Sequence, residues 1–140
     1  MIDPKLYSLL AVVEFGNYTR AAEHLSLTQP AVTHHMKQLE KELDIRIFNR
    51  IGNRIRPTNE GQILIGYARR NIALYEAMNQ GILDEKRHFR RLTVGITPTA
   101  ESNAVAEVLG EYSARNPGTR ITIITDYINN LYSMLKNYEV

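Results

Sequence analysis

With 140 residues, 44% of them hydrophobic, the chain fits one domain or a small domain joined to part of another. It has no cysteine, which excludes disulfides and thiolate metal sites, and its formal net charge of +2 does not by itself identify a nucleic-acid binder. No apolar run approaches the roughly 20 residues that cross a bilayer, and the N-terminus lacks the features of a signal peptide, so we expect a cytoplasmic protein without a membrane partner.

The first predicted helix covers residues 3–15, because apolar side chains recur there at helical spacing until Gly16 ends the pattern. A short second helix follows, which Thr19 can cap. Two small alanines on this second helix let a neighbouring helix approach closely. The apolar face of the first helix is expected to support this helix and the one that comes next.

The third predicted helix has a single apolar stripe at intervals of four, three and four residues, made by Val32, Met36, Leu39 and Leu43. Each helical residue turns about 100°, so Pro30, His34 and Lys37 point away from that stripe, while His35 projects towards the core margin. Thr28 is a suitable N-cap, and proline is tolerated in the first turn. Helix, turn and a second helix with a polar outer face predict a helix-turn-helix, whose second helix reads the major groove.

Several side chains on this outer face suit DNA. Gln29 can form paired hydrogen bonds with adenine, Thr33 can bond to a base or touch a thymine methyl, and His34 can bond to a base or a phosphate. Lys37 is better suited to a phosphate. The alternative is a solvated helix face, which is the usual place of polar residues, but the surrounding motif favours contact with DNA.

Residues 46–56 contain two short segments around Gly52-Asn53, a pair that favours a tight hairpin and hence a winged form of the motif. Residues 45–57 include four arginines and no acidic residue, whereas acidic residues outnumber basic ones from residue 92 onward. Positive potential is therefore concentrated where phosphate contacts are needed. Arg50 and Arg54 are the best candidates to hold the DNA backbone, and Arg56 can instead be solvated.

The segment TRAAEHLSLTQPAVTHHMKQLEKEL, followed by IFNR and PTNEG, resembles the DNA-binding region of LysR-type transcriptional regulators. The resemblance is collinear across residues 3–61. The positions that carry it are Ala21, Ala22, Leu25, Gln29, Pro30, Ala31, Val32, Leu39, Glu40, Leu43, Phe48, Arg50, Thr58 and Gly61. It implies that the residues facing the DNA groove are Thr28, Gln29, Pro30, Thr33, His34 and Lys37.

Thr58 is a good N-cap for one long helix that is predicted from Gln62 to about His88. Two apolar seams run along this helix, so the simplest expectation is that one packs on its own domain and the other meets a second copy. The alternative is burial of the helix against the C-terminal segment of its own chain. The seam assigned to dimerisation comprises Leu64, Ala68, Tyr75, Met78 and Ile82.

Beyond a basic hinge at 85–91, strands are predicted at 92–97 and 120–126, and helices at 100–115 and 129–138. This order implies parallel strands joined by a right-handed crossover. The inward side chains expected on the first of these helices are Val105, Val108, Leu109 and Tyr112. The predicted fold class is mainly α: a winged helix-turn-helix at 1–61, a linker and dimerisation helix with its hinge at 62–91, and an incomplete βαβα start of a periplasmic-binding-protein-like effector domain at 92–140.

By resemblance, Thr97, Thr99 and Ala100 match a loop where LysR-type regulators contact a small-molecule effector. Simple helix capping by Thr99 is the alternative. The four histidines have no partner at ligand spacing, so we expect no metal. No catalytic set or phosphate loop is visible, so neither an enzyme nor a cofactor is expected.

These observations predict a sequence-specific regulator that binds double-stranded promoter DNA as a homodimer, with a tetramer left open. Because two parallel strands normally lie inside a larger sheet, a truncated effector domain is also expected, and this chain is not expected to bind an effector tightly. One alternative is a truncated interaction partner that forms heterodimers with a full-length relative. A small-molecule sensor is the other.

Overall fold

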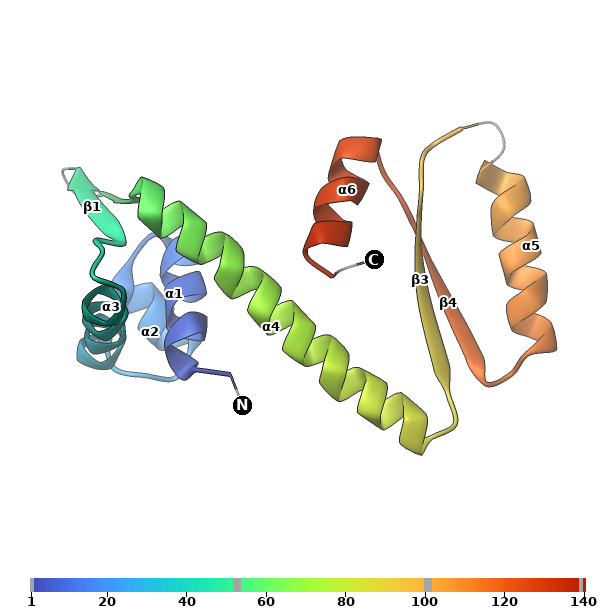
Figure 1. The fold of residues 1–140 in the computed structure, drawn as a ribbon, viewed down its shortest axis with the longest axis horizontal. Coiled ribbons are helices and arrows are strands. Elements are labelled where there is room, and N and C mark those ends of the chain that lie inside the picture. Colours follow the sequence, from blue (N-terminus) through green and yellow to red (C-terminus); the bar gives the residue numbers. More distant parts are fainter. Residues whose placement is uncertain (1, 52–53, 100–101, 139) are drawn as a thin grey trace. The chain divides into compact units, whose positions relative to one another are not determined.

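The structure is a computed structural model that describes residues 2–51, 54–99, 102–138 and 140. Figure 1 shows the elements in chain order. They are α1 (Pro4–Phe15), α2 (Tyr18–His24), α3 (Gln29–Leu43), β1 (Phe48–Ile51), β2 (Arg54–Pro57), α4 (Asn59–Lys86), β3 (Arg90–Ile96), α5 (Ser102–Arg115), β4 (Thr119–Thr125) and α6 (Ile128–Lys136). The mainly helical fold class and its winged helix-turn-helix, long helix and βαβα order are thus confirmed.

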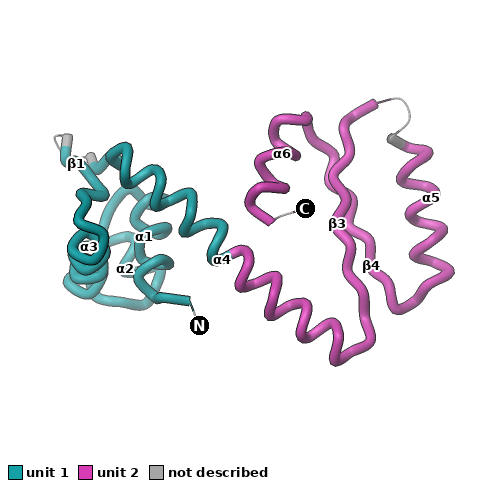
Figure 2. Tube along the Cα trace, viewed as in Figure 1, with its two compact units in different colours: residues 1–72 teal, residues 73–140 magenta. Residues whose placement is uncertain are grey.

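The chain forms two compact units, residues 1–72 and 73–140, which divide within α4 (Figure 2). Unit 1 contains α1 to α3, the two-stranded antiparallel wing of β1 and β2, and the first half of α4. Unit 2 contains the second half of α4, the parallel pair of β3 and β4, and the helices α5 and α6. Each unit is described by itself below.

Short polar side chains begin the first three helices. Asp3 caps α1 by accepting a hydrogen bond from the Lys5 amide. The predicted cap of α3 is also present, because the Thr28 hydroxyl accepts a hydrogen bond from the Ala31 amide. The cap of α2 is Asn17, whose Oδ1 accepts from the Thr19 amide at 2.7 Å. The expectation that Thr19 is this cap is therefore wrong, because the helix already begins at Tyr18 and Thr19 lies within its first turn.

Two adjoining clusters of apolar side chains form the core of unit 1. One joins α1, α3 and α4 through Leu9, Met36, Leu39, Ile47, Ile65 and Ala68. The other joins α1, α2 and α3 through Ala11, Val12, Ala21, Ala22 and Val32. The predicted stripe of α3 is buried at its first three positions, but Leu43 is 49% exposed, because α3 ends there and Asp44 turns the chain with a φ of 52°.

A close backbone contact joins the start of α4 to the loop between α3 and β1. Thr58 caps α4 by accepting a hydrogen bond from the Gly61 amide at 2.9 Å, and its own amide donates to the Ile47 carbonyl at 2.9 Å. A Cβ atom on Gly61 would lie 2.2 Å from that same carbonyl oxygen. Glycine is therefore required here by the close approach of the helix to the loop.

In unit 2, the parallel register runs from Arg90 opposite Thr119 to Ile96 opposite Thr125. Figure 1 shows α5 and α6 on opposite sides of this strand pair, and the side chain of Leu131 in α6 lies over Gly95. The prediction for the inward face of α5 is largely wrong.

The inward residues expected on α5 are exposed except for Leu109, and Val108 is 67% exposed. The half-buried side chains of α5 are instead Ala106, Leu109 and Ser113. The Ser113 hydroxyl donates to the Thr119 carbonyl at 3.0 Å, which fixes the end of α5 against the start of β4. The inner face of α5 thus combines Leu109 with two smaller side chains, and the other large apolar residues point outward.

The junction between α4 and β3 is held by one buried carboxylate. Asp84 accepts hydrogen bonds from Gln80 Nε2 at 2.7 Å and Arg91 Nε at 3.1 Å, while its backbone carbonyl accepts from the Phe89 amide. Together with the bond from the His88 amide to Glu85 and a positive φ at His88, this is the Schellman arrangement of a helix C-terminus. The basic segment after α4 is therefore a defined turn.

Among the described residues, no helix combines the length and the apolar content that a membrane span needs.

Candidate nucleic-acid interface

The outer face of α3 brings together most of the predicted base-reading residues. A shallow depression on this face is lined by Gln29, Pro30, Thr33, His34 and Lys37. All of these except the half-buried Thr33 are exposed, and so is the N-cap Thr28. The structure thus places the predicted groove-facing residues of α3 on one accessible surface, on the opposite side of the helix from its core stripe.

Gln29 and Thr33 are joined by a hydrogen bond from the glutamine Nε2 to the threonine Oγ1 at 2.8 Å. An amide nitrogen carries two hydrogens, so one remains for an external acceptor, and the amide oxygen is also left to accept. The threonine hydroxyl keeps its own hydrogen. This bond therefore orients the glutamine side chain without using up the groups that would meet a base.

The two adjacent histidines have different surroundings, as their angular positions predict. His34 is exposed on the outer face. The Nδ1 atom of His35 lies 2.7 Å from the hydroxyl of Ser8, a fully buried residue of α1. His35 thus joins α3 to α1, and only His34 is available to DNA.

The wing is attached to the core through Phe48, whose ring meets that of Tyr18 edge-on at a centroid distance of 6.4 Å. Arg50 is exposed on β1 and pairs in register with Ile55. Arg54 begins β2, but its side chain and the Gly52-Asn53 tip lie outside the described residues. Of the two predicted wing contacts, Arg50 is therefore the one whose side chain the structure describes, and it lies beside α3.

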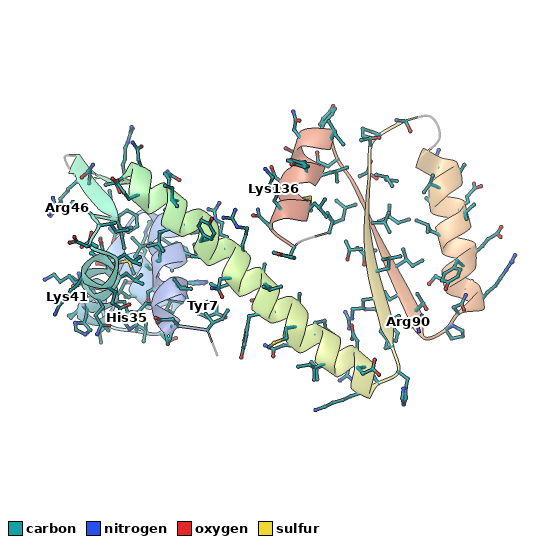
Figure 3. All side chains as sticks on the ribbon, viewed as in Figure 1. Tyr7, His35, Lys41, Arg46, Arg90 and Lys136 are labelled. Carbon is teal, nitrogen blue, oxygen red and sulfur yellow. The ribbon has the colours of Figure 1, made fainter. Side chains whose placement is uncertain are left out.

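Sequence reasoning left Arg46 out of the DNA-binding set, yet it lines a groove of about 670 Å³ between α2, α3 and the wing. Tyr18 and Thr19 line the same groove. Figure 3 labels Arg46 on the outer side of unit 1. Burial raises the pKa of Tyr18, with a smaller effect from the charge of Glu40, so its phenol stays neutral at physiological pH. The signal that pointed to this region was the acid-free run of arginines.

A sequence model described as "Bacterial regulatory helix-turn-helix protein, lysR family" matches residues 5–62, which span the whole of α2, α3 and the wing. The chain belongs to the LysR family.

Curated relatives extend this likeness beyond the DNA-binding region. The HTH-type transcriptional regulator YxjO of Bacillus subtilis is 36% identical over 118 residues, which are 84% of this chain and 40% of that protein. The regulator CitR of the same organism is 30% identical over 132 residues, covering 94% of this chain and 45% of that protein. The chain thus spans less than half the length of these LysR-family relatives, which are named as regulators and not as enzymes.

Solved structures show the same fold. Full-length CbnR in complex with its target DNA has a TM-score of 0.81 at 24% identity, and the aligned region covers 96% of this chain and 46% of the CbnR chain. The isolated CbnR DNA-binding domain, also solved with DNA, is 29% identical with a TM-score of 0.57, and it covers 61% of this chain and 99% of its own.

The structure corrects the predicted dimerisation seam of this LysR-family chain at one position. Ala68 is 1% exposed within the core of unit 1, whereas Leu64 packs against the same cluster but is only half-buried and stays a prediction. Ala68 faces inward because Gly61 brings this side of α4 against the loop at Ile47. Tyr75 is half-buried, while Met78 and Ile82 are exposed and stay predictions.

The neighbouring face of α4 is the exposed one. Ile63 and Tyr67 in unit 1 are each 64% exposed, and Leu74 in unit 2 is 51% exposed. The Arg70 guanidinium lies 4.4 Å from the centroid of the Tyr67 ring, so this face is partly lined by a cation–π pair. We name Ile63, Tyr67, Leu74, Met78 and Ile82 the outer seam of α4.

The predicted effector loop lies between β3 and α5. Thr99 lines a groove of about 570 Å³ together with Pro98, Asn103 and Thr125, whereas Thr97 is half-buried beside it. Ala100 lies outside the described residues. Effector binding at this loop of the LysR-family chain stays a prediction.

Among the described residues, no group of three or more histidine and acidic side chains is placed to hold a metal ion.

Proposed function

We propose that this chain is a transcriptional regulator that binds double-stranded promoter DNA in a sequence-specific manner, with α3 in the major groove. The observation that carries this proposal is the exposed outer face of α3, on which Gln29 is oriented by its hydrogen bond to Thr33. The LysR-family membership and the likeness to the CbnR DNA-binding domain, a protein solved with DNA, support it. The named relatives are regulators, which favours this function over an enzymatic one.

The chemistry follows from the groups that Gln29 leaves available. Its amide oxygen can accept from the N6 amino group of adenine while its second Nε2 hydrogen is donated to N7, which is the bidentate pairing of glutamine with adenine. Thr33 can then touch a neighbouring base or a thymine methyl, and Lys37 can reach a phosphate. Specificity would therefore come from the first two turns of α3, and Lys37 would contribute affinity that does not depend on sequence.

The test is selection of duplexes from a random-sequence pool by the wild-type chain, followed by fluorescence-anisotropy titration of the enriched duplex. Gln29→Ala is expected to weaken binding by about 1–3 kcal/mol and to relax the preference at one base pair. Gln62→Ala is the matched control, because it removes the same exposed amide from α4. Failure of the wild-type chain to enrich any sequence at moderate salt would refute sequence-specific binding.

The outer seam of α4 is the surface through which we propose that a second copy binds. Its members follow one another at intervals of four, seven, four and four residues, so they share one face of a helix. Exposed apolar side chains in such a row favour burial against a partner. A dimer related by a two-fold axis uses the same seam on both copies and matches a two-fold-related DNA site.

Sedimentation equilibrium tests this dimer. Tyr67→Asp places a charge within the seam and is expected to shift the chain from dimer to monomer at micromolar concentration. Asn79→Asp is the control, since it adds the same charge at an exposed position of α4 outside the seam. A monomeric wild-type chain, or equal association of both variants, would contradict the proposal.

A further inference from the structure

The groove beside the wing is lined by two arginines, Arg46 and Arg50, that do not line the base-reading depression of α3. It lies between α2, α3 and β1, has a volume of about 670 Å³, and is lined by Tyr18, Thr19, Lys37, Arg46, Phe48 and Arg50, among others. We propose that this groove binds the sugar-phosphate backbone of one DNA strand, with Arg46 as a phosphate contact in addition to Lys37 and Arg50. This inference rests on the proposed function, because it assigns a further part of the same DNA-binding surface.

The backbone on both sides of Arg46 is fixed by hydrogen bonds. The Ile45 amide donates to the Glu40 carbonyl at 3.1 Å, and the Ile47 amide donates to the Glu40 carboxylate at 2.9 Å. The Thr58 hydroxyl donates to the carbonyl of Arg46 itself. The guanidinium therefore extends from an anchored backbone, so less conformational freedom is lost when it binds an anion.

The charged side chains that line the groove are all positive. Its lining residues include Lys37, Arg46 and Arg50 and no carboxylate. The nearby carboxylate of Glu40 is engaged by the Ile47 amide. Within the described part of the chain, none of the three cations forms an ion pair, so their charge is available to an anion from outside.

The position of the groove favours a DNA strand over a small free anion. Gln29 and Lys37 line both this groove and the base-reading depression of α3, so the two surfaces are continuous. When a recognition helix enters the major groove, the phosphates of the flanking strands lie beside it. An occupant of the groove would thus lie beside bases read by α3, and Arg46 would hold it without reading sequence.

The experiment measures the affinity of the full chain for the selected duplex and for a random duplex across a series of salt concentrations. Arg46→Ala is expected to weaken both complexes by the same factor and to lower the slope of log K against log salt by about 0.9 for each protomer bound. Arg46→Lys should keep that slope. Arg69→Ala, which removes an exposed charge of α4 outside the groove, is the matched control and should leave the slope at its wild-type value.

Three results would overturn the inference. The first is a slope for Arg46→Ala equal to that of Arg69→Ala. The second is a loss confined to the selected duplex, which would indicate a base contact. The third is saturation of the Arg46 Nε–H NMR signal by millimolar inorganic phosphate without DNA, which would indicate a site for a free anion. A wild-type chain that binds no duplex would instead refute the proposed function, so the two failures are distinguishable.

Discussion

Replacing Gly61 by alanine tests the close contact that joins α4 to the loop before the wing. The added Cβ would lie 2.2 Å from the Ile47 carbonyl oxygen, 3.0 Å from its carbon and 3.1 Å from the Thr58 hydroxyl. Two of these atoms belong to the backbone, so no side-chain rotation can relieve the overlap. Either α4 must move away from the loop, or the loop must move towards the wing.

The size of the effect follows from three contributions. Overpacking of a tight core contact costs about 1–3 kcal/mol, and a rigid backbone carbonyl favours the upper end of that range. Displacing the carbonyl also weakens its hydrogen bond from the Thr58 amide, which contributes about 1 kcal/mol. Alanine is a better helix former than glycine by about 1 kcal/mol, which offsets part of this loss. We expect a net destabilisation of about 2–3 kcal/mol.

Urea unfolding followed by circular dichroism measures this change, and amide hydrogen exchange of residues 1–72 assigns it to unit 1. The control is Gly66→Ala in the same helix, where an added Cβ has no atom within 4 Å. There the helix-forming advantage should remain alone and stabilise unit 1 by about 0.5–1 kcal/mol. If Gly61→Ala were as stable as Gly66→Ala, close packing would not explain the glycine at position 61.

Three further outcomes are expected. Ser8→Ala leaves the buried side of His35 without its partner and should lower the unfolding free energy by about 1 kcal/mol in urea titrations. Asp84→Ala releases the turn after α4, so trypsin should cleave its basic residues faster than in the wild-type chain. Burial alone would raise the pKa of Asp3, but hydrogen bonds from Lys5 lower its pKa overall. The stabilisation that ionised Asp3 provides is therefore present above the ordinary pKa and is lost as pH falls through the lowered value. Titration of the unfolding free energy from pH 6 to about 2 should show this loss of stability, and the loss should be smaller in Lys5→Met.

The part of α3 that sequence could predict depends on angles within one helix. Helical spacing alone separates the core side chains Val32 and Met36 from the outer residues, and it assigns His34 and His35 to different surroundings. The cap at Thr28 was also predictable, because the residues that it serves are its immediate neighbours in sequence. Features of this kind need no knowledge of what the helix packs against.

Features that depend on a distant partner were less predictable. Both seams of α4 have similar apolar content, and the choice between them is made by Gly61, which brings the Ala68 side of the helix onto the Ile47 loop. Likewise, α5 turns Ser113 inward and leaves Val108 exposed, although valine is more hydrophobic than serine. Arg46 was missed for a related reason, since its place in the groove is set by two hydrogen bonds of the loop, in which the Ile47 amide donates to Glu40 and the Arg46 carbonyl accepts from Thr58.

The loop at 45–47 therefore connects three roles of unit 1 that look separate in the sequence. Ile47 is fully buried and its carbonyl is contacted by the start of α4, while the preceding residue lines the groove proposed for the DNA backbone. The neighbouring, exposed face of α4 carries the outer seam proposed for the second copy. A change in how α4 lies on the loop would consequently alter both the position of the phosphate contact and the direction in which the seam faces. Dimer geometry and DNA-backbone contact are thus expected to depend on each other through the contact between α4 and the loop at 45–47.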